Sequence, residues 1–175
     1  MRRSGAKWSD VVVGLVVLLM IGTFTLAQMI NQQEIANRVK CASNLRQIGQ
    51  AMLLYANENK GKYPREMGEL LLTQDVTIEV FVNPAGKTKA PRNKNKEDQA
   101  AWVSKDSDYE YLGAGKDNRT GPEVVLAHEK MRPGAQGINM LYGDGHVEWN
   151  VSSVAEQTLA KQRAADMKMM KKGGQ

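Results

Sequence analysis

Residues that form covalent links or carry out chemistry are scarce in this sequence. Its 175 residues include one cysteine, Cys41, and two histidines, His128 and His146. A single cysteine excludes an intrachain disulfide, and a zinc site normally takes three or four cysteine or histidine ligands. The sequence also lacks a phosphate-binding loop, a dinucleotide-binding fingerprint and a serine-nucleophile motif. We therefore predict that the protein is not an enzyme and holds no cofactor or metal, and that Cys41 is a small buried side chain on a helix.

One arrangement would still bring four potential metal ligands together, if the strands that carry them paired. The set would give a mixed site of imidazole and carboxylate ligands. The plainer interpretation places one histidine at the end of a strand and the other beside a turn, and we favour it. The four residues are His128, Glu129, Asp144 and His146.

Positive charge exceeds negative charge, but it is not concentrated. The net charge is +5, so nucleic acid and an anionic lipid surface have to be considered as partners. The lysines and arginines are scattered, and the two densest groups, KTKAPRNKNKEDQ and KMMKK, contain no aromatic residue. A basic surface in contact with water is the simpler interpretation, and we do not expect nucleic acid as a partner.

Proline is absent before Pro64, and the long apolar run of the sequence lies in this part. The run covers residues 11–27 and continues to Ile30, about 20 residues in all, which is the length of a membrane-spanning helix. Basic residues precede the run, and this predicts a cytoplasmic N-terminus and an extracytoplasmic remainder. A signal peptide cut before Gln28 is the alternative that remains open.

Beyond the run, apolar residues recur at spacings of three and four, the period of one helix face. No proline interrupts residues 8–60, so we predict one continuous helix. Its first part would cross the membrane, and its second part would lie on a globular domain. The apolar positions of the second part are Ile35, Val39, Ala42, Leu45, Ile48, Met52 and Tyr55.

The globular part has the signals of a small antiparallel sheet. Short β-rich runs are separated by loops, and one continuous apolar run suits a central strand. Asp144-Gly145 stands between two such runs, and this dipeptide is typical of hairpin turns that need positive φ. Residues 85–99 have the composition of a loop. The expected strands are residues 76–84, 108–115 and 122–129 and the hairpin 138–150.

These elements predict an α+β fold, with a long N-terminal helix packed on a small antiparallel sheet and a C-terminal helix. A sheet with an apolar face needs such a cover. The predicted segments are a basic leader (residues 1–7), a transmembrane helix (8–30), its amphipathic continuation (31–60), the sheet-containing part (61–150), the C-terminal helix (151–172) and a tail (173–175).

Three segments resemble a known family. They are RRSGAKWSDVVVGLVVLLMIG, CASNLRQIGQAMLLYANENKGKYP and GINMLYGDGHVEW. The sequence resembles bacterial type IV prepilins and type II secretion pseudopilins, and most closely the pseudopilin-like proteins that end in a His…Asp-Gly-His-Val motif. The resemblance implies a pilin-like fold, with Asp144, Gly145 and His146 in the terminal hairpin. It also implies cleavage between Gly5 and Ala6 by a prepilin peptidase and methylation of the new terminus.

The function implied by the resemblance is that of a structural subunit of a type II secretion or type IV pilus-like filament. The subunit would sit in the inner membrane by a single span, with its domain periplasmic, and would assemble with copies of itself or with other pseudopilins. Asp10 would be the fifth residue after the cut, where the family usually has glutamate. A carboxylate there would pair with the free amino terminus of a neighbouring subunit in a low-dielectric setting.

The leader departs from the family pattern, and this keeps a second hypothesis open. Ala6 and Lys7 stand where the family has a hydrophobic residue and threonine, and Ala27 replaces the helix-bending proline. An uncut leader would supply no amino group for Asp10. The alternative is therefore an anchored binding module that does not polymerise and that uses its basic domain on DNA, a wall polymer or lipid headgroups.

Overall fold

The computed structural model describes residues 8–173, without the side chains of residues 9–10, 24–28, 30–31, 170 and 172–173. The predicted leader, residues 1–7, lies outside this range. The chain divides into two compact units, Met1–Ala36 and Asn37–Gln175. The helix α1 begins at Trp8 and ends at Glu58, and it contributes to both units.

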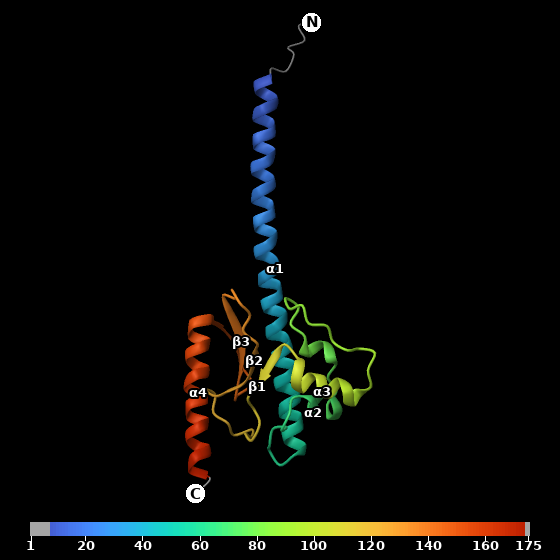
Figure 1. Ribbon diagram of the computed structural model, residues 1–175, viewed down its shortest axis with the longest axis vertical. Helices are drawn as coiled ribbons and strands as arrows, with labels where there is room; N and C mark the ends of the chain where they lie inside the picture. Colours follow the sequence, from blue (N-terminus) through green and yellow to red (C-terminus); the bar gives the residue numbers. More distant parts are fainter. Residues whose placement is uncertain (1–7, 174–175) are drawn as a thin grey trace. The chain divides into compact units, whose positions relative to one another are not determined.

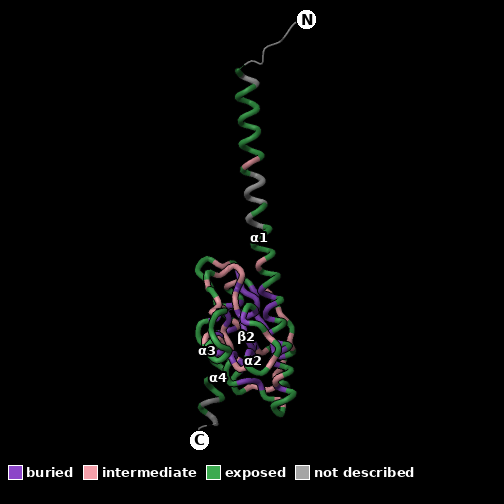
Figure 2. The backbone as a smooth tube through the Cα atoms, turned by 90° about the vertical axis from the view of Figure 1, so that its right-hand side faces the viewer, coloured by how far each residue is buried: buried purple, intermediate pink, exposed green. Residues whose placement is uncertain are grey.

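The first unit is helical throughout its described part. Large apolar side chains of α1 from Val11 to Ile21 are exposed at every position except Gly14, and Figure 2 shows this stretch as exposed. Within the described residues, no helix combines the length and the hydropathy needed to cross a membrane. This finding contradicts the prediction of a transmembrane segment over residues 8–30, and with it the predicted single-pass location in the inner membrane.

The second unit contains one antiparallel sheet of four strands in the order β1-β2-β3-β4, so that neighbours in the chain are neighbours in the sheet. The central strand β2 is buried along its whole length, as its continuous apolar run predicts. The predicted hairpin is confirmed, with Gly145 at a φ of 87° between its strands. The strands are β1 (Tyr109–Tyr111), β2 (Val125–Glu129), β3 (Gly137–Tyr142) and β4 (Val147–Val151).

Helices cover both faces of the sheet (Figure 1). On one face, Leu45, Ile48 and Met52 of α1 form a core with apolar residues of β2 and β3. On the other face lies α4 (Ser152–Gly173), which packs Ala155 and Leu159 against the strands. Of the predicted stripe on α1, the positions from Ala42 to Met52 are buried, whereas Ile35 and Val39 are exposed.

Two predicted elements are wrong. The expected strand at residues 76–84 is a single 3-10 turn, η1 (Ile78–Phe81), because a short apolar run alone does not distinguish a strand from a buried turn. The expected loop at residues 85–99 ends in a helix, α3 (Lys96–Asp106), which the Asn95 side chain caps by accepting from the Asp98 amide. The short helix α2 (Gly68–Thr73) packs on α3.

Candidate assembly surface and cationic pocket

The residues predicted to direct assembly are only partly described. Gly5 and Ala6 lie outside the described residues. Asp10 belongs to α1, but its side chain is not among those described. The predicted pairing of this carboxylate therefore lies outside the described residues, and the neighbouring surface of α1 is described next.

We define the apolar segment as residues 11–21 of α1. Apart from Gly14, each of its residues is a valine, leucine, isoleucine or methionine with an exposed side chain. Consecutive residues of a helix point in different directions, so the exposed apolar surface runs around the helix and does not form one stripe. Such a surface is buried only when other apolar groups contact it on several sides, and contiguous exposed apolar patches of this kind mark interaction sites.

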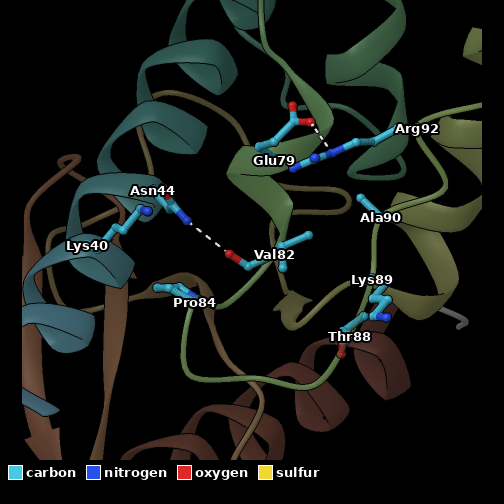
Figure 3. A pocket seen from close by; sticks show the side chains of 9 residues that line it. All are labelled: Lys40, Asn44, Glu79, Val82, Pro84, Thr88, Lys89, Ala90 and Arg92. Carbon is cyan, nitrogen blue, oxygen red and sulfur yellow. Dashed lines mark hydrogen bonds and ion pairs between the residues drawn. The ribbon is translucent and has the colours of Figure 1, made fainter. Parts of the chain in front are cut away.

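A second feature is a pocket of about 420 Å³ in the second unit, which we call the cationic pocket (Figure 3). Lys40 and Asn44 enter it from α1, and Thr88 and Lys89 lie across from them on the loop before α3. The Asn44 amide donates to the carbonyl of Val82 at 3.1 Å, which fixes the connection after η1 to the helix. The lining residues are Lys40, Asn44, Glu79, Val82, Pro84, Thr88, Lys89, Ala90 and Arg92.

The charges of the cationic pocket do not balance. Arg92 Nε lies 2.8 Å from the carboxylate of Glu79, whose pKa is lowered by hydrogen bonds from its own backbone amide and Thr77 and by the Arg92 charge. Among the described residues, neither Lys40 nor Lys89 forms an ion pair. The pocket therefore presents two uncompensated ammonium groups, which attract an anion.

His128 and Glu129, predicted as possible ligands of one site, point to opposite faces of the sheet. His128 faces α4, where its Nε2 lies 3.5 Å from Glu110, a residue that also pairs with Arg163 of α4. Burial lowers the pKa of His128, and Glu110 opposes this only in part. Glu129 lies instead beneath α1, close to Cys41.

The hairpin residues form a separate group at the surface. The His146 amide and imidazole both contact the carboxylate of Asp144, and the imidazole stacks on Tyr142 with 4.5 Å between ring centres. The hydrogen bonds from the His146 amide and imidazole lower the pKa of the Asp144 carboxyl. Within the described residues, no three histidine, cysteine or acidic side chains come together in a way that could hold a metal ion.

A buried polar network escaped the sequence analysis. Glu129 is buried and forms no ion pair with the described lysines and arginines. Its carboxylate accepts from Asn83 Nδ2 at 2.8 Å and from the amide and side chain of Asn139 at 3.0 and 2.6 Å. Asn139 also donates to the carbonyl of Arg38 on α1. Burial, together with the nearby Glu129, raises the pKa of Cys41 to about 12, so this thiol is protonated and inert at neutral pH.

Comparison of the chain with models of protein families, with curated proteins and with solved structures gives no match. The features that bear on function are therefore the two surfaces described above and the motifs of the sequence.

Proposed function

We propose that the protein is a pilin- or pseudopilin-like structural subunit that forms a filament through the apolar segment of α1. The observation that carries the proposal is the exposure of this segment around the helix. A coiled-coil dimer buries a single stripe, whereas a helix in a bundle of many copies is covered on several sides. Contacts between copies that do not close on themselves generate a helical filament.

The sequence supports the same proposal independently. The basic leader, the acid at Asp10 and the Asp144-Gly145-His146 hairpin are the features that resemble pilin-like subunits. In the proposed filament, Asp10 pairs with the amino terminus of a neighbour and sets the register between helices. Prepilin peptidase and other pseudopilins are the partners that this function requires.

A matched pair of leucines on α1 tests the proposal. Leu15 and Leu54 are both 56% exposed, but only Leu15 belongs to the apolar segment. We expect Leu15→Asp to abolish pelletable filaments sheared from cells that express the full chain, because it places a charge in an apolar interface. Leu54→Asp should leave them unchanged. Equal amounts of filament from both variants would refute the role of the segment.

Cross-linking gives a second readout. In a Cys41→Ala background, cysteines at Val13 and Leu18 should give ladders beyond the dimer with a bifunctional maleimide. The same pair of cysteines at Lys94 and Lys105, which are exposed in the second unit, should give far fewer. A ladder absent from the first pair would show that the segment does not meet copies of itself.

The cationic pocket favours a second candidate function, a binding module for an anionic polymer. Lys40 and Lys89 would contact phosphate groups of a wall polymer, DNA or lipid headgroups. With poly(glycerol phosphate) as the probe, we expect affinity to fall with added salt. Replacing both lysines with alanine should weaken binding, whereas the same change at Lys94 and Lys96, outside the pocket, should not. If affinity changed neither with salt nor on replacement of Lys40 and Lys89, this function would be ruled out.

A further inference from the structure

The strand β4 forms one edge of the sheet, and no described strand pairs with its outer side. Two hydrogen bonds lie at the two ends of the β3–β4 pair. The Tyr142 amide donates to the carbonyl of His146, and the Ser152 amide donates to the carbonyl of Gln136. In an antiparallel pair, hydrogen-bonded residues alternate with residues whose backbone groups point away. The register therefore turns the N–H and C=O groups of Val147 and Trp149 outward, and among the described residues no hydrogen bond reaches them.

The only protection that β4 gives this edge is one exposed charge, Glu148. Natural sheets shield edge strands with prolines, lysines or bulges. The strand reads Val-Glu-Trp-Asn-Val, and its pairing with β3 is regular over five residues. Val151 is exposed, and Trp149 is only half-buried, with the Arg38 guanidinium 4.2 Å from its ring centre. A groove of about 220 Å³ separates this part of β4 from α1.

The sequence of β4 is complementary to itself. In an antiparallel pair of two copies centred on Trp149, each Trp149 faces its counterpart, and Val147 faces Val151. Glu148 faces Asn150, so no like charges stand directly opposite each other. The outward N–H and C=O groups of Val147 and Trp149 in one copy can form hydrogen bonds with the outward groups of the other copy. A two-fold axis makes such a contact closed, which distinguishes it from the open contacts of a filament.

We propose that two copies of the chain associate through β4 and form a continuous eight-stranded sheet. This dimer uses no residue of the apolar segment, and it can form before or without filament assembly. The partner is therefore a second copy of this chain, recognised by main-chain hydrogen bonds and by the apposed tryptophans.

Single cysteines test the register. In the full-length chain with Cys41→Ala and Leu15→Asp, the second change removes assembly through the apolar segment. Trp149→Cys should then give a disulfide-linked dimer on mild oxidation, because position 149 faces itself. Glu148→Cys, one residue away, should give no dimer above background, because it faces Asn150. Equal cross-linking at both positions, or none at 149, would overturn the proposal.

A variant that keeps the native tryptophan provides the second measurement. Light scattering of the Leu15→Asp chain should report a mass that doubles with concentration. Adding Val151→Lys should hold the mass at one copy, because it brings two charges to the apolar edge. Val154→Lys, at an exposed site on α4, should leave the dimer intact. A monomer at every concentration, or a dimer that tolerates Val151→Lys, would refute the contact. Filaments that persist in Leu15→Asp would instead count against the proposed function.

Discussion

The two parts of α1 have the same backbone conformation and opposite surroundings. Between residues 11 and 21 every residue except Gly14 has an apolar side chain, and these side chains are exposed. Between residues 41 and 56 they are spaced by three and four, and they form a core with the sheet. The comparison teaches that the spacing of apolar residues decides where a helix is buried. A single apolar stripe can be buried against the rest of the same chain, whereas apolar side chains on all sides of a helix are buried only by contacts with other molecules.

The largest expected effect separates the buried part of α1 from its exposed side. Leu45 is fully buried in the core, and Leu54 is 56% exposed. Leu45→Ala should lower the free energy of unfolding by about 2–5 kcal/mol, through lost burial and a cavity. Leu54→Ala should change it by less than about 0.5 kcal/mol. Urea denaturation of both variants measures this, and similar midpoints would contradict the assignment of the buried face.

The next effect concerns the network that ties α1 to the sheet. Asn139→Ala removes the side-chain hydrogen bonds to Glu129 and to the carbonyl of Arg38. A buried carboxylate that loses a donor should cost about 1–3 kcal/mol of stability. The control is Asn57→Ala, an exposed position on α1. If the two variants unfold at the same urea concentration, the hydrogen bonds of Asn139 do not stabilise the fold.

A smaller effect depends on pH, and it tests the face of the sheet opposite α1. Burial lowers the pKa of His128 in the folded chain, so the unfolded chain takes up the proton first as pH falls. The stability linked to His128 is present above its ordinary pKa of about 6.5 and is lost as pH falls through the folded value. His128→Gln should flatten this loss between pH 7 and pH 5, with Glu110 and Arg163 still facing the site. His146→Gln, at the exposed turn, should not flatten it.

The smallest effect on stability should come from the apolar segment itself. Leu15→Ala removes an exposed side chain, so the free energy of unfolding should change by less than about 0.5 kcal/mol. The same variant should still reduce filament assembly, because the lost contacts lie between copies. Thermal unfolding and filament yield, measured on one preparation, separate these outcomes. A marked loss of stability would place the segment in a core of the monomer.

The sequence predicts local elements better than their surroundings. The absence of proline and the apolar spacing predict α1, and Asp144-Gly145 predicts the hairpin, because both signals are local. The cap at Asn95 and the acidic first turn of α3 were available signals, but the lysines and asparagines around them are typical of a loop. The strand expected at residues 76–84 fails because a buried turn has the same apolar content.

The candidate sites depended on contacts between distant residues. Lys40 and Lys89 line one pocket, although the rest of α1, the helix α2 and the turn η1 lie between them in the chain. Glu129 meets Asn83 and Asn139 only once the sheet has formed under α1. The prediction of a membrane-crossing segment rests on hydropathy and length, and the described helices contradict it.

The strands follow one another in the sheet in the order in which they are synthesised. Each strand pairs with the next one to leave the ribosome, so the sheet closes locally. The α1 residues that cover this sheet are synthesised first. Gly49 lies against the Leu141 side chain in the folded chain, and this packing can form only after β3 has been synthesised. At about 5–20 residues per second, translation of the intervening chain takes roughly 5–20 s. During that interval the apolar stripe of α1 lacks the strands that cover it in the folded chain, so it is exposed and can be bound by chaperones.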